Sequence, residues 1–410
     1  MRLRTMSTIV PVCMEVLLVT TKTFLEFFAG IGLVGEALRD SGWTCIYAND
    51  IDPKKKKVFE EHYGATPHYH LGDVWSTDEA VGRIKGRPAL ATASFPCTDL
   101  SLAGHWKGLD GSESSTYFGF LKAIERLGDR KPRLIMLENV TGFLTANNGE
   151  DFPRAVRKLA ELGYWIDSFV IDAKYFVPQS RPRLFVIGLH CSVRSPLVTR
   201  QDRERFFGDP WRSEIDSLPE LRPAKLVRAM VNTELPTGWF TVPLKPPTPT
   251  GMKLDDIIDL DDGQDWWDEP QVRKHYGIMH DYHREKIDEF LRTGASYIGT
   301  IFRRTRGGSM KAEVRFDGVA GCLRTTKGGS ARQIVYAVAD GKLRMRWMSP
   351  REYARLQGAE DFAIGESHNQ SMYGFGDAVC VPVVRWIDRN VLTPLFESTA
   401  EVKAGSTAVA

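Results

Sequence analysis

Three short motifs in the sequence carry side chains that can make and break bonds. A cysteine ends Ser94-Phe-Pro-Cys97, a carboxylate begins Glu138-Asn-Val140, and Arg181 and Arg183 lie two apart in a Gln-Ser-Arg-Pro-Arg run. A thiolate is a good nucleophile, a carboxylic acid can supply a proton, and a guanidinium can hold a planar polar group. The three motifs together predict covalent catalysis by Cys97.

This set of groups suits methylation of an unreactive ring carbon such as C5 of cytosine. A Cys97 thiolate that adds to C6 makes C5 enamine-like and therefore nucleophilic. Glu138 would bond to N3 and N4 and stabilise the developing charge, while Arg183 would hold O2 and Glu138. For single motifs the alternatives are a buried structural cysteine at Cys97, and a solvated basic patch or a phosphate contact at Arg181 and Arg183.

A glycine-rich turn indicates a nucleotide-like cofactor. Phe28-Ala-Gly30-Ile31-Gly32 follows a β-type run and precedes a helical pattern, so backbone amides can approach a polar ligand closely. Asp50 and Ile51 follow about twenty residues later and offer a carboxylate for ribose hydroxyls. Asp73-Val74 offers a further carboxylate for an adenine amino group. A dinucleotide site, a packing turn and a solvated turn aspartate are the alternatives.

The elements that must position these residues alternate between strand and helix. Alternating β and α elements predict a mostly parallel sheet with helices on both faces. The reactive groups then lie at the carboxyl ends of strands, where α/β sites form. The predicted strands are 22–29, 44–48, 89–94, 134–137, 165–171 and 184–189, and the clearest helices are 33–39 and 152–162.

The alternation ends near residue 191, which predicts a second lobe. Prolines, acidic runs and isolated aromatics follow, and an apolar-faced helix at 379–392 could return to the first lobe. Trp266 and Trp267 are expected to pack within the second lobe. The predicted divisions are an extension at 1–21, a catalytic and cofactor-binding lobe at 22–190, a target-recognition lobe at 191–340, a return to the catalytic lobe at 341–397, and a disordered tail at 398–410.

Composition is that of an ordinary globular protein. Lys plus Arg (54) nearly balance Asp plus Glu (52), so a nucleic-acid site must come from local clustering of charge. The six cysteines form no CxxC pair, which favours reduced thiols in the cytoplasm. His275, His280 and His283 lack a common metal-ligand spacing, so no metal is expected. No stretch predicts a signal peptide or a membrane span.

The ordered motifs FFAGIG, NDID, GDV, FPC, ENV, QSRPR, RTTKGGSARQIV and GFGDAVCVPVV resemble the C5-cytosine-specific DNA methyltransferases of bacterial type. The resemblance covers roughly 24–190 and 319–392. It implies a class I, Rossmann-like methyltransferase lobe with a smaller, irregular target-recognition lobe. It also implies DNA (cytosine-5-)-methyltransferase activity, base flipping, S-adenosylmethionine as methyl donor with S-adenosylhomocysteine as product, no metal, and double-stranded DNA as partner.

The resemblance implies roles for particular residues. Catalysis would fall to Cys97, Glu138 and Arg183, with Arg181 beside them. A glycine-rich stretch at 104–111 would act as a lid. The cofactor would be bound by Phe28, Gly30, Ile31, Gly32, Asp50, Ile51, Asp73, Val74, Pro96, Asp377 and Val379. DNA would be contacted by Ser101, Lys107, Arg303, Arg304 and Arg306. The three arginines are expected to lie in a flexible basic loop beside Gly307 and Gly308. An ordinary solvated face is the alternative for this loop.

Several positions depart from the family pattern. Leu33, Thr98 and Asp377 replace a frequent glycine, glutamine and asparagine, and the lid at 113–115 lacks the arginine often found before the helix. An aspartate at 377 either repels the carboxylate of the cofactor's amino-acid end or pairs with its ammonium. The expected protein is a cytoplasmic, nucleoid-associated monomer that works with a separate restriction endonuclease or alone. The competing functions are a nicotinamide-dependent oxidoreductase, a tRNA methyltransferase, which would carry a Cys-Phe-Thr tripeptide absent here, and a catalytically silent DNA-binding relative.

Overall fold

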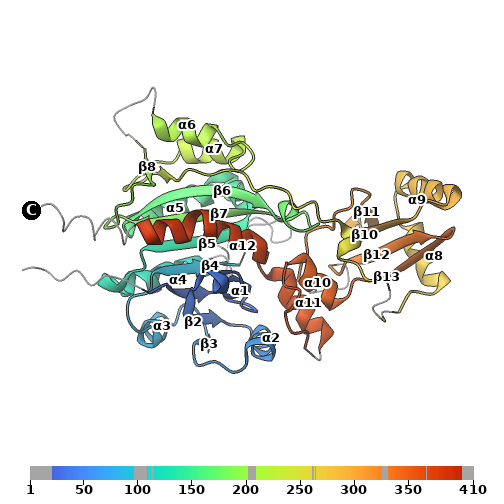
Figure 1. Cartoon of the computed structure of the whole chain (residues 1–410), viewed down its shortest axis with the longest axis horizontal. Coiled ribbons are helices and arrows are strands. Elements are labelled where there is room, and N and C mark those ends of the chain that lie inside the picture. Colours follow the sequence, from blue (N-terminus) through green and yellow to red (C-terminus); the bar gives the residue numbers. More distant parts are fainter. Residues whose placement is uncertain are drawn as a thin grey trace, which may run out of the picture.

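The computed structural model describes residues 21–96, 109, 111, 115–201, 209–260, 263, 265–325, 331–365 and 367–398. Within these residues, the larger part of the molecule contains a seven-stranded sheet of order β3-β2-β1-β4-β5-β7-β6 (Figure 1). Neighbouring strands are parallel from β3 to β5, and β7 is antiparallel to β5 and β6. The mostly parallel α/β sheet predicted from sequence is therefore confirmed. The strands are β1 (Thr23–Phe27), β2 (Thr44–Asp50), β3 (Tyr69–Leu71), β4 (Leu90–Ala93), β5 (Leu134–Val140), β6 (Tyr164–Asp172) and β7 (Pro182–His190).

The strand order reverses between β1 and β4, and such a reversal opens a crevice at the carboxyl edge of the sheet. The chain leaves β1 into the glycine-rich turn and leaves β4 toward Pro96. Asp50 ends β2, and Glu138 lies near the end of β5. Four segments that carry predicted site residues therefore meet at one edge.

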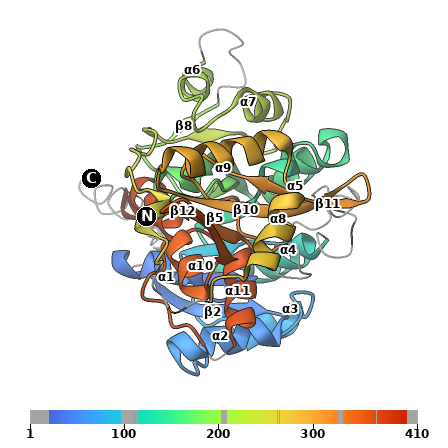
Figure 2. The ribbon, with the colours of Figure 1, turned by 90° about the vertical axis from the view of Figure 1, so that its right-hand side faces the viewer.

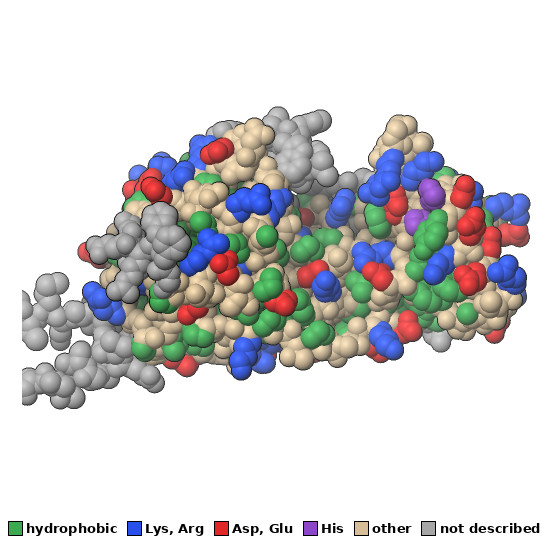
Figure 3. Space-filling view, turned by 90° about the horizontal axis from the view of Figure 1, so that it is seen from above, with side chains coloured by type: hydrophobic (Ala, Val, Ile, Leu, Met, Phe, Trp, Pro, Cys, Tyr) green, Lys and Arg blue, Asp and Glu red, His purple; other side chains and the backbone are tan. Residues whose placement is uncertain are grey.

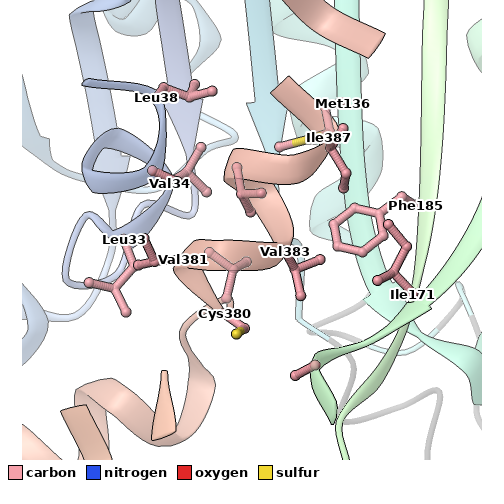
Figure 4. Close-up of a cluster of buried hydrophobic side chains, with 14 of the residues drawn as sticks. Leu33, Val34, Leu38, Met136, Ile171, Phe185, Cys380, Val381, Val383 and Ile387 are labelled. Atoms are coloured by element: carbon pink, nitrogen blue, oxygen red, sulfur yellow. The ribbon is translucent and has the colours of Figure 1, made fainter. Parts of the chain in front are cut away.

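Two layers of helices cover the sheet. Alternate residues of β5 face opposite layers, Met136 toward α1 and α12 and Ile135 toward α4 and α5. α12 lies beside α1, and Figure 4 shows Val383 and Ile387 between α1 and the strands that carry Met136 and Phe185. The helices are α1 (Leu33–Leu38), α2 (Pro53–Tyr63), α3 (Thr77–Arg83), α4 (Thr116–Arg126), α5 (Asp151–Glu161) and α12 (Val381–Ile387), which continues through a π-type turn (Asp388–Leu392).

The segment after β7 also packs against the large sheet. Trp211 and Trp239 belong to the same buried cluster as α5. Arg222 and Asp167 of β6 form an ion pair of 2.9 Å in which both side chains are 1% exposed. The alternating pattern of the sequence ends at residue 191, but packing against the large sheet continues beyond residue 241, because Val242 belongs to the same buried cluster as Met136. This segment contains β8 (Thr199–Arg200), α6 (Pro210–Asp216), α7 (Ala224–Val231) and β9 (Phe240–Thr241).

The smaller part of the molecule lies beyond α10 and α11 and contains, among the described residues, a four-stranded antiparallel sheet of order β11-β10-β12-β13 (Figures 1 and 2). α8 and α9 pack on this sheet through a separate cluster that includes Met279, Ile287 and Tyr336. The elements are α8 (Glu269–Gly277), α9 (Asp281–Thr293), β10 (Tyr297–Arg306), β11 (Ser309–Val314), β12 (Ile334–Ala339), β13 (Lys342–Trp347), α10 (Pro350–Leu356) and α11 (His368–Asp377). In the part of the chain that is described, no helix has the length and apolarity that a membrane crossing requires.

Candidate active site

The ends of β5 and β7 bring Glu138 and Arg183 together. Val140 is the register partner of Arg183, and Glu138, two residues earlier, projects to the same face of the sheet. Arg183 Nε lies 2.9 Å from Glu138 Oε1, and the two side chains are 15% and 8% exposed. The predicted acid and its arginine therefore form a largely buried, charge-assisted pair at the crevice.

The end of β4 is tied to this pair. Asn139, the residue after Glu138, donates from Nδ2 to the carbonyl of Phe95 at 3.1 Å. Pro96 is the last described residue of this segment. The described part of this segment is therefore hydrogen-bonded to the residue that follows Glu138. Cys97 itself, Thr98, Ser101, Lys107 and most of the expected lid lie outside the described residues.

Arg181 is almost fully buried, at 2% exposure, and its guanidinium binds backbone carbonyls. It donates to Leu323 O at 3.0 Å and, at the end of α11, to Gly376 O, Asp377 O and Ala378 O at 3.4, 3.3 and 2.7 Å. These contacts join the start of β7 to the segment that leads to Val379. They support a positioning role for Arg181, and the expected part in catalysis stays a prediction.

Cys322 lies between the two arginines. Its sulfur is 3.3 Å from Arg181 Nη1 and 3.7 Å from Arg183 Nη2. Burial alone would raise the pKa of the thiol, but the two guanidinium charges lower it below its ordinary value. Sequence reasoning missed this contact, because Cys322 belongs to no motif and is brought to the arginines by tertiary packing alone.

The glycine-rich turn has the backbone conformation that its composition predicts. Gly30 and Gly32 have φ values of 58° and 82°, and a Cβ at Gly32 would lie 2.7 Å from the Phe59 ring. The Gly30 amide donates to Asp50 Oδ2 at 2.9 Å, while the Asp52 amide donates to Asp50 Oδ1 at 2.9 Å. The predicted ribose-binding carboxylate is thus fixed beside the turn. Phe28 also adopts a positive φ, of 57°.

Exposed apolar side chains surround the next strand ends. Ile51 is 67% exposed, Trp75 44% and Leu71 39%, unusual values for large apolar groups. Asp73 lies among them, and its Oδ1 accepts the Trp75 amide at 3.0 Å. An apolar surface with a carboxylate at its edge suits a flat heteroaromatic ring. The predicted residues Ile31, Val74 and Val379 are buried.

Another of the predicted cofactor-binding residues, Asp377, lies at the end of α11. Asp377, the last residue of α11, forms an ion pair with Lys55 of α2, with Nζ and Oδ2 3.0 Å apart. Sequence reasoning did not select Lys55, because four successive lysines at 54–57 are typical of a solvated helix face. The conformation of Asp52, which caps α2 and accepts the Lys54 amide, directs the helix toward the turn.

The three arginines proposed to contact DNA lie in strand β10, so the expectation of a flexible basic loop was wrong. Gly307 and Gly308, both with positive φ, form a two-residue hairpin turn to β11. Arg304 Nε and Arg306 Nε lie 2.8 and 3.4 Å from Glu313 Oε1. On the other side of the strand, the Arg303 guanidinium lies 4.6 Å from the centre of the Trp347 ring. On the face in Figure 3, basic and acidic side chains are intermixed.

The histidines and tryptophans of the smaller part mainly pack together. The rings of Trp267 and His275 are 4.4 Å apart, and Trp267 lies 5.0 Å from Trp347, as expected for packing within the lobe. His275 Nδ1 lies 2.9 Å from the Gln271 carbonyl. No group of three or more potential metal ligands occurs among the residues that the structure describes.

A sheet of order 3-2-1-4-5-7-6 with an antiparallel seventh strand, and a glycine-rich turn after β1, define the Rossmann-like methyltransferase fold. The sequence profile of the C-5 cytosine-specific DNA methylases matches residues 22–393, and the chain belongs to this family. Its activity is that of a DNA (cytosine-5-)-methyltransferase.

Individual relatives agree with this assignment. The Type II methyltransferase M.HpaII of Haemophilus parainfluenzae is 26% identical over 390 residues, which are 91% of this chain and 90% of M.HpaII. M.HhaI of Haemophilus parahaemolyticus is 30% identical over 165 residues, or 40% of this chain and 48% of M.HhaI. Among solved structures, S. pombe Dnmt2 has a TM-score of 0.52 at 16% identity, covering 91% of this chain and 99% of Dnmt2, a likeness of fold alone.

Proposed function

We propose that this enzyme transfers a methyl group from S-adenosylmethionine to C5 of a cytosine flipped out of duplex DNA, through a covalent bond between Cys97 and C6. The observation that carries the proposal is the Glu138–Arg183 pair at the carboxyl edge of the sheet, hydrogen-bonded through Asn139 to the residue pair that precedes Cys97. This arrangement supports a site in which a nucleophile, an acid and a guanidinium act on one ring.

The chemistry assigns each group one task. The Cys97 thiolate forms a bond to C6, and the electron pair of the C5–C6 double bond shifts toward C5 and N3. Glu138 bonds to N3 and the N4 amino group and compensates the charge that develops there, while Arg183 holds O2 and orients Glu138. S-adenosylmethionine supplies an electrophilic methyl group. Once the methyl group is bonded to C5, the C5 proton is lost to solvent water, its electron pair re-forms the C5–C6 double bond, and the C6–sulfur bond breaks to release the Cys97 thiolate.

The residues present fit the cofactor. Asp50 is positioned for ribose hydroxyls, because Gly30 and Asp52 hold both of its carboxylate oxygens at the edge of the turn. Ile51, Leu71 and Trp75 offer exposed apolar surface for the adenine ring, with Asp73 as acceptor for its amino group. The donor set contains carboxylates and backbone amides beside apolar side chains, as a nucleoside requires.

The burial of the proposed acid supports base flipping. Glu138 is 6% exposed, and a cytosine that remains stacked in duplex DNA would have no access to its carboxylate. The smaller part of the molecule, with the β10–β11 hairpin, would read the sequence around the flipped base. Double-stranded DNA is the proposed substrate, and a separate restriction endonuclease is the proposed functional partner.

The proposal is tested in two steps. Bisulfite sequencing of plasmid DNA from expressing cells identifies the methylated site. A duplex in which the target is 5-fluorocytosine is then incubated with enzyme and S-adenosylmethionine. Because fluorine cannot leave C5 as a proton does, the Cys97–C6 bond should persist, giving a complex that survives denaturing electrophoresis. Its absence from the wild-type reaction, while ordinary duplex is methylated, would contradict the covalent route; Cys97→Ser provides the control.

A mispaired target tests flipping separately. Part of the few-kcal/mol cost of unpairing and unstacking is already met in a mispair. Binding to a duplex with a mispaired target cytosine should therefore be tighter than binding to the paired duplex. Equal affinities for the two duplexes would count against flipping.

A further inference from the structure

The ion pair between Lys55 and Asp377 stands at the edge of the glycine-rich turn and joins α2 to α11. Lys55 is in the first turn of α2, and Asp377 is the last residue of α11. Their side chains are 16% and 43% exposed, with Nζ and Oδ2 3.0 Å apart. The pair is therefore confined on the lysine side and open to a ligand on the aspartate side.

Close packing fixes where both partners stand relative to the turn. A Cβ placed on Gly374 would lie 2.5 Å from Ile31 Cγ2, so α11 can approach the turn only because residue 374 is glycine. A Cβ placed on Gly30 would lie 3.9 Å from Lys55 Cδ, so the lysine stem runs alongside the turn. Arg181 fixes the Asp377 backbone through its carbonyl. Neither charge can move far from the turn.

Charges around Lys55 keep it protonated. Burial alone would lower the pKa of its ammonium, but the carboxylates of Asp377 and then Asp50 raise it above the ordinary lysine value. Asp50 is the carboxylate that accepts the Gly30 amide. Lys55 therefore stands as a permanent cation between the proposed ribose ligand and the end of α11, with its Nζ 5.8 Å from the centre of the Tyr373 ring.

A partly exposed pair of this kind contributes little to stability, typically about 0 to 1 kcal/mol. As a binding surface it presents a cation and an anion side by side. A zwitterion that carries both an ammonium and a carboxylate on one carbon matches that arrangement, because each of its charges meets an opposite one. The amino-acid end of S-adenosylmethionine is such a group.

We propose that Lys55 and Asp377 form the subsite for the amino-acid end of the cofactor, with Lys55 binding the α-carboxylate and Asp377 the α-ammonium. The inference rests on the proposed cofactor site and adds Lys55 to it. It also decides between the two effects that sequence allowed for an aspartate at 377. Asp377 attracts the ammonium, and Lys55 offsets the repulsion that Asp377 would exert on the carboxylate.

The test compares two ligands by isothermal titration calorimetry. S-adenosylhomocysteine carries the zwitterion, whereas 5′-methylthioadenosine keeps the nucleoside and lacks the amino-acid end. Lys55→Met should weaken binding of S-adenosylhomocysteine about 10- to 100-fold, equivalent to about 1.4 to 2.8 kcal/mol, and leave binding of methylthioadenosine within twofold. Lys54→Met, an exposed neighbour on the same helix, should change neither affinity.

The double variant Lys55→Met/Asp377→Asn gives a second readout. Asp377→Asn alone should weaken binding of S-adenosylhomocysteine. In the Lys55→Met background the same substitution should lower the affinity less, or restore it, since it removes an Asp377 carboxylate that no longer has a lysine partner. Thermal unfolding checks that each variant is folded.

Each result decides something different. Unchanged affinity of Lys55→Met for S-adenosylhomocysteine, or an equal loss for both ligands, overturns the subsite. Additive losses in the double variant overturn the pairing of the two charges. If wild-type protein binds neither ligand, the proposed cofactor site itself fails, and that outcome is distinct from failure of the subsite.

Discussion

The edge of the seven-stranded sheet and the β10–β11 hairpin both concentrate charge, but they use it differently. At the sheet edge Glu138, Arg183 and Asp50 are held by neighbouring strands with little exposure. On the hairpin Arg304 and Arg306 share Glu313 at the surface. The first region is organised before any ligand arrives, whereas the second would have to exchange an internal ion pair for the proposed contact with DNA. The proposed catalytic residues and the proposed DNA-contacting residues therefore belong to separate sheets.

The strongest test of the organised region is Cys97→Ala. Methyl transfer should be lost, because the variant lacks the thiol proposed to add to C6, while S-adenosylmethionine should bind within a few-fold of wild type. Tritium transfer to DNA and calorimetry measure the two properties. Turnover near the wild-type rate would contradict the covalent mechanism. It would also leave the ordered arrangement of Glu138 and Arg183 without the proposed catalytic explanation.

Glu138→Gln should lower the methylation rate by about 10² to 10⁴, the range of general acid–base contributions. Glutamine keeps the shape and can still hydrogen-bond to Arg183, but it cannot supply the N3 proton. Single-turnover kinetics at saturating DNA isolate the chemical step. An unchanged rate would assign Glu138 a structural role.

The hairpin should respond more weakly. If Arg304 and Arg306 grip phosphates, each alanine variant should bind all sequences less tightly and flatten the slope of log affinity against log salt by about one unit. If one reads a base, the loss should be about 1 to 3 kcal/mol at a single base pair. We expect phosphate contacts for at least two of the three arginines.

Two matched variants sharpen this result. Glu313→Gln should tighten DNA binding a few-fold, because it frees both arginines. Arg303→Ala tests the opposite side of the strand, where the guanidinium lies over Trp347. Unaltered binding in all three arginine variants would place the DNA surface elsewhere on the smaller part.

The last expected effect concerns stability, not DNA binding or methyl transfer, beneath the glycine-rich turn. Burial raises the pKa of Glu26 to about 8, although the amides of Gly35 and Val34 act to lower it. In the unfolded chain the pKa of a glutamate is about 4.3. The stability that protonated Glu26 contributes is therefore fully present below that pH and is lost as pH rises toward about 8.

Glu26→Gln should remove this dependence. The wild-type free energy of unfolding should fall relative to that of the variant by at most about 1.4 kcal/mol per pH unit between about pH 4.5 and 8. Urea unfolding at several pH values measures it. Parallel pH profiles for the two proteins would show that Glu26 is not the group responsible.

The alternation of apolar strand-like runs and helical patterns predicted the large sheet well. The predicted site residues could be found from the sequence because they lie directly at the ends of these strands. Arg183 was expected on chemical grounds to hold Glu138, and the two side chains form an ion pair. Cys322 and Lys55 were not found, because they reach the site by packing between segments distant in sequence. The three arginines were predicted to lie in a loop, because the adjacent Gly307 and Gly308 are typical of loops. These glycines form only the turn, and the arginines belong to strand β10.

The position of α12 has a consequence for how the protein is made. This helix fills the space between α1 and the large sheet, and Asp388 accepts a hydrogen bond from Trp43 across 345 residues of sequence. The groove that contains Leu33, Val34 and Leu38 therefore stays open on the ribosome until nearly the whole chain has been synthesised. The lobe whose strands are synthesised first is therefore completed only when α12 has been made. Until then its exposed apolar groove is where chaperones would be expected to bind during translation.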